Sequence, residues 1–398
     1  MSLNQYSDQH NLYQPDVFKD NCGFGLIAHT HGEASHDLVQ TAIHSLSCMT
    51  HRGGVAADGK TGDGCGLLIA TPKVFFKKIA SDNGFTLNEI FAVGTVFVNL
   101  DKALAQHSQD TLSQAIEAQG LLVAGWRDVP VDGSDLGESV KAIEPVIRQV
   151  FIGRGTDVTV TDALERKLYI IRKASGHAIQ ALNLEHGKEF YVASMSARTM
   201  VYKGMLMADQ VGSYFLDLQD PRLVSALALI HQRFSTNTFP TWDLAHPFRL
   251  IAHNGEINTV RGNVNWMYAR RHAMSSDLLG RDLDKMWPLI PHGQSDTACI
   301  DNALEPEGLT HGIAQYWDAK YVQQLSRLDL TIAQYLENLE AMKWIISDRY
   351  YRERYDFAII SENAEPTYTI SADGVTKNTV RVDPGLWSLE LPAWDPVR

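Results

Sequence analysis

Short apolar segments without long helical patterns between them are the feature that most constrains the fold of this chain. The pattern predicts strands at residues 24–29, 66–71, 91–100, 121–128, 167–172, 190–194, 225–234 and 248–253, and helices at 37–49, 73–80, 104–119 and 138–151. Predicted strands such as 167–172 and 190–194 follow one another directly, so antiparallel pairing is favoured over a repeated βαβ unit. The sequence therefore predicts an α+β fold.

Composition and charge narrow the classes of partner. The 398 residues are 44% hydrophobic, enough for a substantial core, and the length fits two or three domains or one large unit. Lys and Arg number 35 against 47 Asp and Glu, a net charge of −12 that opposes attraction to nucleic acid or to an anionic membrane. No stretch approaches the ~18 apolar residues of a membrane span. We expect no nucleic-acid or membrane partner and a cytoplasmic location.

Cys22 opens the run Cys22-Gly23-Phe24-Gly25 and can become a new N-terminus if the chain is cut after Asn21. One residue would then supply a thiol, with a reference pKa of ~8.5, and an α-amino base with a reference pKa of ~7.7–8.0. Residues 1–21 are polar and lack the apolar core of a signal peptide, which leaves a removable propeptide or a frayed tail. A lone early cysteine is also commonly a buried apolar side chain.

The segment 54–61 satisfies the letters of a phosphate-binding P-loop, G-x-x-x-x-G-K-T. A working P-loop needs a buried strand before it and a helix that begins at the lysine. Here a helix is expected to end upstream, and Gly62 and Gly64 would break a helix beginning at Lys60. Asp58 adds negative charge where phosphate would lie. We therefore expect these glycines to form tight turns and no nucleotide to bind.

Three further segments carry groups suited to an amino-acid substrate. Arg233 follows an apolar run, and its planar fork can hold a carboxylate by two hydrogen bonds or pair with a structural Asp. Asn254 and Gly255 end another run, where an amide and a backbone N–H can stabilise an oxyanion or form an ordinary turn. Asp296 precedes the apolar run 298–304 and can cap a helix or receive an ammonium group.

These segments together resemble one enzyme family in order and spacing. The match involves Cys22-Gly23-Phe24-Gly25, His51-Arg52-Gly53, Asp58-Gly59-Lys60-Thr61-Gly62-Asp63-Gly64, Gly125 to Pro130, Tyr202-Lys203-Gly204, His231 to Thr238, His253 to Asn258 and Ser295-Asp296. Over residues 21–304 the sequence resembles the N-terminal glutaminase domain of glutamate synthase large subunits, a class II glutamine amidotransferase of the N-terminal-nucleophile (Ntn) hydrolase type. The resemblance implies a four-layer αββα sandwich of two mainly antiparallel sheets between helices.

The resemblance also implies residue roles for hydrolysis of L-glutamine to glutamate and ammonia. Cys22, once its amino group is free, would be the nucleophile and would carry a γ-glutamyl thioester. Asn254 and the N–H of Gly255 would form the oxyanion hole.

Substrate recognition follows from the same resemblance. Arg233 would hold the α-carboxylate of glutamine and Asp296 its α-amino group. Thr236 and Asn237 stand where the family has further pocket contacts. A generic amidohydrolase of the same fold would not need the pairing of Arg233 with Asp296.

The resemblance divides the chain and assigns its cofactors and partners. Residues 1–21 would be a propeptide and residues 22–398 the amidotransferase domain, with family motifs in 22–304 and a divergent part at 305–398. In a whole synthase, ammonia reaches a second site that makes glutamate from 2-oxoglutarate with FMN, an iron–sulfur cluster and electrons from NADPH or ferredoxin. This chain is expected to bind none of these cofactors, so a synthase domain or the glutamate synthase small subunit would be its partner. Two alternatives stay open: another Ntn-type amidohydrolase, or an inactive, truncated or rearranged fragment.

The other cysteines and a histidine cluster receive plainer interpretations. Cys48, Cys65 and Cys299 lie in apolar or glycine-rich surroundings and are expected to be buried structural thiols. The histidines at 29, 31 and 36 lack further ligands at metal-binding spacing, so we expect surface side chains and no metal site.

Overall fold

The computed structural model describes residues 23–181, 190–232, 239–252, 260–271, 274, 276–310, 370–371 and 374–375. The chain divides into two compact units, Met1–Ile313 and Ala314–Arg398. In the second unit, β9 (Ile370–Ser371) pairs antiparallel with β10 (Gly374–Val375). In the divergent part at 305–398, the sequence predicts a helix near 325–346 and strands at 356–361 and 367–371. Of these ranges only residues 370–371, in β9, lie within the described residues.

The described part of the first unit alternates strands with helices. In chain order the strands are β1 (Phe24–Ala28), β2 (Cys65–Ala70), β3 (Phe91–Val98), β4 (Leu122–Asp128), β5 (Val146–Gly153), β6 (Tyr191–Ser196), β7 (Thr199–Gly204) and β8 (Leu227–Gln232). The α-helices are α1 (His36–Ser47), α2 (Lys73–Asp82), α3 (Lys102–Ala118), α4 (Glu138–Lys141), α5 (Thr161–Ala181), α6 (Val211–Tyr214), α7 (Val260–Arg270) and α8 (Asp296–Thr310). Short 3-10 helices are η2 (Thr50–Arg52), η4 (Leu216–Gln219) and η6 (Gly280–Met286).

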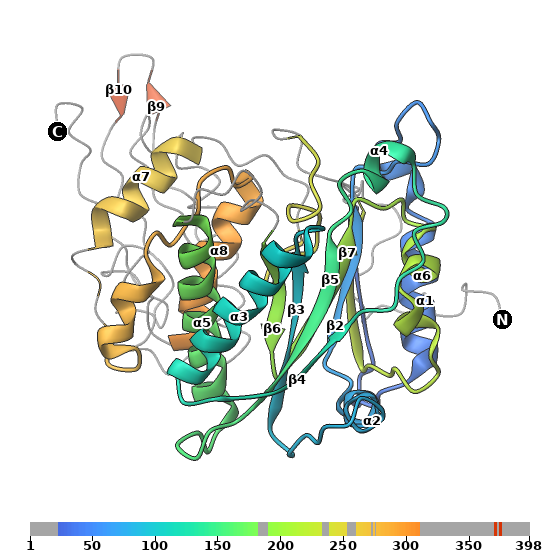
Figure 1. Cartoon of the computed structure of the whole chain (residues 1–398). Coiled ribbons are helices and arrows are strands. Elements are labelled where there is room, and N and C mark those ends of the chain that lie inside the picture. Colours follow the sequence, from blue (N-terminus) through green and yellow to red (C-terminus); the bar gives the residue numbers. More distant parts are fainter. Residues whose placement is uncertain are drawn as a thin grey trace. The chain divides into compact units, whose positions relative to one another are not determined.

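The strands form two four-stranded sheets, with the orders β1-β8-β2-β7 and β4-β5-β3-β6. Every pair within them is antiparallel. In Figure 1 the strands stand in the middle, with α3, α5 and α8 on one side and α1 and α6 on the other. The predicted α+β class and the αββα sandwich are confirmed.

Two apolar clusters hold these layers together. The larger cluster joins one face of the β4-β5-β3-β6 sheet, with Val93 and Phe151, to the β1-β8-β2-β7 sheet, with Leu67 and Ile230, and to α1. The second cluster lies between the other face of the β4-β5-β3-β6 sheet and helices α3 and α5. Since successive residues of a strand point to opposite faces, β3 and β5 contribute alternate residues to the two clusters.

Three predicted elements are wrong, two of them because their segments are buried on both sides. Residues 167–172 lie within α5, residues 146–151 begin β5, and residues 248–252 form neither helix nor strand. On α5, Leu168 and Ile171 enter the cluster beneath the sheet, whereas Tyr169 and Ile170 enter a third cluster with η6. Burial on both sides removes the polar face that marks a helix or a surface strand. The spacing of apolar residues then no longer distinguishes a helix from a strand.

The P-loop-like segment folds as a turn around its own carboxylate. Val55 and Gly62 form an isolated antiparallel β-bridge. Asp58 Oδ1 accepts hydrogen bonds from the backbone N–H groups of Lys60 (3.0 Å) and Thr61 (2.9 Å). These hydrogen bonds and that of the Thr61 hydroxyl hold the pKa of Asp58 below its ordinary value. The carboxylate thus binds the N–H groups that a phosphate would need, and the predicted absence of a helix beginning at Lys60 is confirmed.

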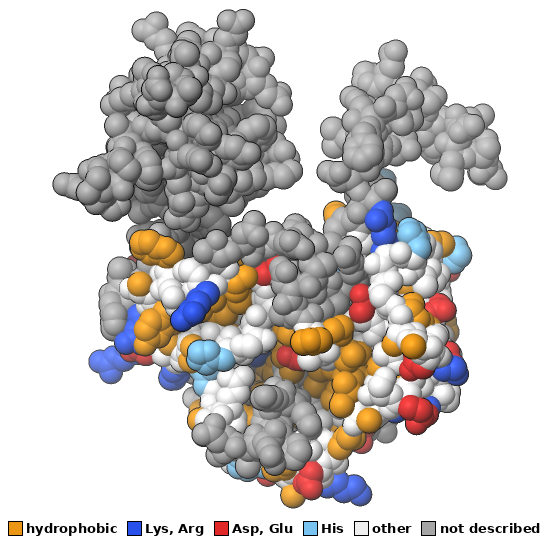
Figure 2. All heavy atoms as spheres, turned by 90° about the horizontal axis from the view of Figure 1, so that it is seen from above, with side chains coloured by type: hydrophobic (Ala, Val, Ile, Leu, Met, Phe, Trp, Pro, Cys, Tyr) orange, Lys and Arg blue, Asp and Glu red, His pale blue; other side chains and the backbone are white. Residues whose placement is uncertain are grey.

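The surface of the molecule carries charges of both signs. On the face seen from above, acidic and basic side chains are interspersed, and apolar side chains gather near the centre (Figure 2). On the outer strand β1, Phe24 and Leu26 are 48% and 63% exposed.

Candidate active site

The first part of the candidate site is the shared end of β1 and β8. Phe24 pairs with His231, and the next N–H along β8, that of Gln232, donates a 2.6 Å hydrogen bond to the carbonyl oxygen of Gly23. Gly23, His231 and Gln232 are all buried. Cys22 precedes Gly23 and Arg233 follows Gln232, so the two motifs approach one another through the β1–β8 ladder.

Glycine motifs pack against this end of the sheet. A Cβ atom on Gly53 would lie 1.8 Å from Gln232 Nε2, so the bare backbone makes room for the buried Gln232 side chain. Gly64 has a φ of +122° and its Cβ would lie 3.0 Å from that of Ala245. Cys65, next in sequence, pairs with Gln232 on one side and with Gly204 on the other. Motifs distant in the sequence therefore meet at this end of the sheet. They can do so because glycine, which has no Cβ, allows such a close approach of the backbone.

The second part is the start of α8. Asp296 is only 3% exposed, and its Oδ1 accepts the backbone N–H of Thr297 at 2.7 Å. Ser295 is fully buried, and its hydroxyl oxygen accepts the N–H of Ala298 at 3.2 Å, the bond expected of a helix cap. Ser295 therefore caps α8, and Asp296, the first residue of the helix, also accepts a backbone N–H of the first turn.

Only one of the candidate site residues lies in the part of the chain that the structure describes. Asp296 is described, whereas Cys22, Arg233, Thr236, Asn237, Asn254 and Gly255 lie outside the described residues. Their described neighbours are Gly23, Gln232 and Ala252. Leu244 and Phe248, from the segment that leads to Ala252, form an apolar cluster with Ala298 in the first turn of α8.

A buried ion-pair network that the sequence analysis missed links this segment to α8. The guanidinium of Arg249 lies 2.9 Å from Asp301 Oδ2 and donates from Nε to Glu305 Oε2 at 3.1 Å. Glu305 also pairs with Arg172 of α5. Burial alone would raise the pKa of Glu305, but Arg172 and Arg249 outweigh it and hold that pKa below its ordinary value. The available sequence signal was the spacing of Asp301 and Glu305, two carboxylates four residues apart on α8.

Lys203 of β7 is another buried cation, to which the sequence analysis gave no role beyond its place in the motif Tyr202-Lys203-Gly204. Its Nζ donates to the carbonyl oxygen of Asp243 (2.7 Å) and to the Tyr191 hydroxyl (3.2 Å), and lies 4.6 Å from the ring centres of Tyr191 and Phe248. Burial, followed by the nearby charge of Arg249, lowers the pKa of Lys203 to about 7. This lysine therefore titrates near neutral pH.

The three described cysteines lie in different surroundings. Cys65 and Cys299 are buried as predicted, and burial raises the pKa of Cys65 well above its ordinary value and that of Cys299 to about 11. Cys48 is exposed, so its predicted burial is wrong; it ends α1, whose buried face is made by other residues. In the described ranges, no group of three or more His, Cys, Asp or Glu side chains could hold a metal ion.

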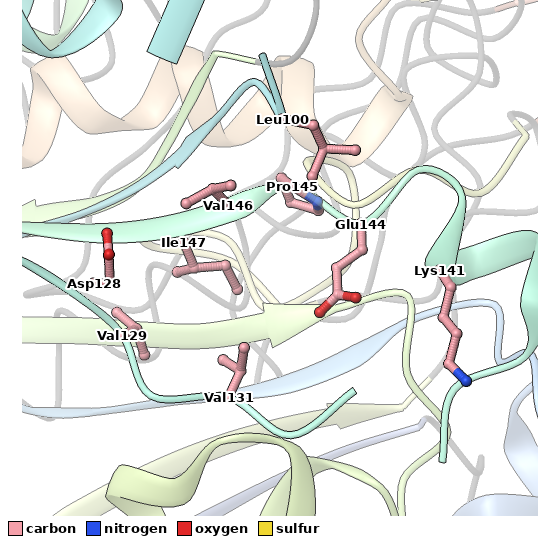
Figure 3. Close-up of a pocket in the computed structure, with 9 residues that line it drawn as sticks. All are labelled: Leu100, Asp128, Val129, Val131, Lys141, Glu144, Pro145, Val146 and Ile147. Carbon is pink, nitrogen blue, oxygen red and sulfur yellow. The ribbon is translucent and has the colours of Figure 1, made fainter. Parts of the chain in front are cut away.

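A hollow of about 300 Å³ lies where β4 ends and β5 begins (Figure 3). Val129, Val131 and Ile147 line it, with Glu144 and Lys141 among its charged residues. The Tyr214 hydroxyl donates to Glu144 at 2.6 Å, so this carboxylate serves a structural contact. None of the candidate site residues lines this hollow.

Known proteins with similar sequences identify the family. The family of class-II glutamine amidotransferases matches residues 22–315. The large chain of glutamate synthase (NADPH) from Bacillus subtilis is 43% identical over 305 residues, which cover 77% of this chain and 20% of that protein. The glutamate synthase (NADH) of Schizosaccharomyces pombe is 43% identical over 303 residues, covering 74% of this chain and 14% of that protein. A chloroplastic ferredoxin-dependent glutamate synthase 2 from Arabidopsis thaliana is 39% identical over 298 residues, covering 74% and 18%.

This chain thus spans a fifth or less of the length of these relatives. Among the described residues, no helix is both long and apolar enough to cross a membrane. The family match begins at Cys22 and covers most of the chain, including the Gly23–Gln232 ladder and the start of α8. The chain belongs to the class-II glutamine amidotransferases.

Proposed function

We propose that this chain is the glutamine-hydrolysing part of a glutamate synthase and that Cys22 is its nucleophile. The observation that carries the proposal is the β1–β8 register, in which Gly23 and Gln232 are hydrogen-bonded neighbours. Consecutive Cα atoms are ~3.8 Å apart, so the Cα of Cys22 lies that far from the Cα of Gly23, and the Cα of Arg233 that far from the Cα of Gln232. A nucleophile and a carboxylate-binding arginine at one strand end suit attack on an amino-acid side chain.

The chemistry needs no group beyond these residues and water. The free α-amino group of Cys22 takes the thiol proton, and the thiolate attacks the side-chain amide carbon of glutamine. Asn254 and the N–H of Gly255 stabilise the oxyanion that forms. The protonated α-amino group of Cys22 then returns its proton to the amide nitrogen of glutamine. The C–N bond breaks, and the nitrogen leaves as ammonia. Water attacks the γ-glutamyl thioester, releasing glutamate and the thiol.

Substrate recognition uses the zwitterion of glutamine. Arg233 holds the α-carboxylate as a bidentate partner, and Asp296 accepts the α-ammonium group, with Thr236 and Asn237 as further pocket contacts. The burial of Asp296, which is 3% exposed at the start of α8, supports this role, because a charge-assisted hydrogen bond to an ammonium group is strong where water is excluded. An amidohydrolase acting on a neutral amide would gain nothing from this pair of charges.

The wider assembly is also a proposal. Residues 1–21 form a propeptide and residues 22–398 the amidotransferase domain, whose ammonia passes to a synthase site on a partner domain or subunit. FMN and an iron–sulfur cluster belong to that partner. The described cysteines fit no cluster, because Cys65 and Cys299 are buried thiols on β2 and α8 and Cys48 is exposed after α1.

The deciding experiment measures ammonia release from L-glutamine by the purified chain and its Cys22→Ala variant. The parent should turn over and Cys22→Ala should not, while both melt at similar temperatures. Cys48→Ala is the matched control, since Cys48 is exposed and outside the proposed site, and it should keep the parental rate. Turnover that survives Cys22→Ala would refute the nucleophile.

The assignment of cofactors has its own readout. The parent alone should show no flavin absorbance and form no glutamate from 2-oxoglutarate and ammonia, since redox chemistry of this kind needs a cofactor. Bound flavin or reductive amination by this chain alone would contradict the assignment. Glutaminase activity should rise when a separate synthase domain is supplied, because such contacts order catalytic loops.

A further inference from the structure

We propose that Arg249 and Asp301 are positioning residues that hold the chain leading to Asn254 at a set place against the helix that begins with Asp296. The amide carbonyl and the α-ammonium group of one glutamine would then meet their partners together. This inference rests on the proposed function, and it adds two residues that act through the segment they hold.

Asp301 binds the segment before Asn254 at two successive residues. Its Oδ1 accepts the backbone N–H of Leu250 at 2.8 Å, and its Oδ2 lies 2.9 Å from Arg249 Nη2. The Asp301 side chain is fully buried and that of Arg249 is 9% exposed, so solvent screens this pair little. The same carboxylate therefore fixes both the backbone and a side chain of the approaching segment.

The sequence spacing makes this contact a link between the two recognition groups. Asp301 lies five residues after Asp296 on α8, about 7.5 Å along the helix axis. Arg249 lies five residues before Asn254. Five residues of chain span at most ~18 Å, so holding Arg249 against α8 limits how far Asn254 can lie from Asp296, and a single substrate must span that distance.

Arg249 is in turn anchored on rigid elements. Its Nε donates to Glu305 one turn further along α8, and Glu305 pairs with Arg172 of α5. Its Nη1 donates to the Tyr191 hydroxyl at 3.3 Å and to the carbonyl oxygen of Val192 at 3.4 Å, both in β6. One guanidinium thus fixes a segment without regular structure to α8 and to the β4-β5-β3-β6 sheet.

Stability alone is a weak reason for such a network. Burying ions costs several kcal/mol of desolvation per ion, and well-packed apolar residues often stabilise a core as well or better. Directional hydrogen bonds from a planar guanidinium, by contrast, specify one relative position of the parts they join. The network is therefore suited to holding a geometry that function requires.

The test compares two substrates, L-glutamine and glutaramate, which has the same terminal amide and carboxylate but lacks the α-amino group. We expect Asp301→Asn and Arg249→Lys to lower the ratio of kcat/KM for glutamine to that for glutaramate by about tenfold, because Asp296 no longer meets the ammonium group in register with the amide. The full-length chain is used throughout.

Asp217→Asn is the matched control. Asp217 is a buried carboxylate of η4 that accepts hydrogen bonds from Arg127 (3.2 Å) and from the Tyr202 hydroxyl (3.0 Å). This variant should lower the melting temperature as Asp301→Asn does but keep the parental substrate ratio. An unchanged ratio in both Asp301→Asn and Arg249→Lys, or an equal fall in Asp217→Asn, would overturn the proposal.

Hydrogen exchange tests the link without turnover. In Arg249→Lys, the protection of backbone amides should fall in residues 244–252 and in residues 296–302 together. In Asp217→Asn, protection should not fall in both segments together. Loss confined to one segment would show that Arg249 does not couple them. A parent chain that hydrolyses neither substrate contradicts the proposed function, whereas the exchange result still decides whether the link exists.

Discussion

The backbone N–H of Gln232 donates a 2.6 Å hydrogen bond to the carbonyl oxygen of Gly23, at the common end of β1 and β8. Gly23 follows the proposed nucleophile Cys22, and Gln232 precedes the proposed carboxylate-binding Arg233. Two residues about 210 positions apart in sequence are thereby brought to one strand end by the ordinary ladder of an antiparallel sheet. The strand register therefore brings Gly23 and Gln232, the described neighbours of two proposed site residues, to one place.

The mature protein should begin at Cys22. An amide-blocked cysteine has no α-amino base, so a chain that retains residues 1–21 should lack turnover. Intact mass and N-terminal sequencing of an active preparation check this, and a fully active protein that still begins at Met1 would be inconsistent with it.

Loss of one oxyanion donor should slow the chemical step. Asn254→Ala should lower kcat by ~10²–10³ and leave the glutamine KM close to that of the parent, because the interaction forms mainly in the transition state. Steady-state kinetics measure both constants. A rise in KM with unchanged kcat would place Asn254 in ground-state binding instead.

Glutamine recognition should depend on geometry as well as on charge. Arg233→Lys keeps the charge but loses the planar fork, and Asp296→Asn removes the charge opposite the ammonium group, so both should raise the glutamine KM substantially. Calorimetric binding of glutamine to the same substitutions in a Cys22→Ala background measures affinity without turnover. Parental affinity in either variant would mean that the pocket has been placed wrongly.

Adding one methyl group at Gly53 should disturb the site through Gln232. The new Cβ would lie 1.8 Å from Gln232 Nε2, so Gly53→Ala should cost about 1–3 kcal/mol of unfolding free energy and lower kcat/KM. Gly176→Ala is the matched control: it lies within α5 with no atom within 4 Å of its added Cβ, and it should stabilise the protein by about 0.5–1 kcal/mol. Urea titrations and glutaminase assays compare the two, and a neutral Gly53→Ala would rule out the tight packing.

Lys203 should make stability rise with pH on the alkaline side of neutral. Its pKa is about 7 in the folded protein against an ordinary value of 10.5, so the unfolded chain binds more protons between these limits. The unfolding free energy then increases by up to about 1.4 kcal/mol per pH unit as pH rises from about 7, and the cost of burying the ammonium is fully present below pH 7. Thermal melts of the parent and Lys203→Met between pH 6.5 and 10 give this contribution as a difference, and identical pH profiles would contradict it.

The sequence by itself determined the family and most of the secondary structure. The run that begins at Cys22 and the glycine motifs carry chemistry that depends on residue identity and order. Helices α1 and α3 each have one polar and one apolar side, and each begins after a capping residue, Ser35 for α1 and Asp101 for α3. Both helices could therefore be predicted from the local sequence.

Only the tertiary structure decided the elements and contacts whose causes are distant in sequence. The helix across 161–181 and the strand across 146–153 are buried on two sides, which removes the periodicity that separates helix from strand. Arg249 finds Asp301 and Glu305 because the fold brings α8 against an irregular segment more than fifty residues earlier. Local sequence predicts what a segment can form by itself, whereas the partner of a buried charge depends on which elements pack against it.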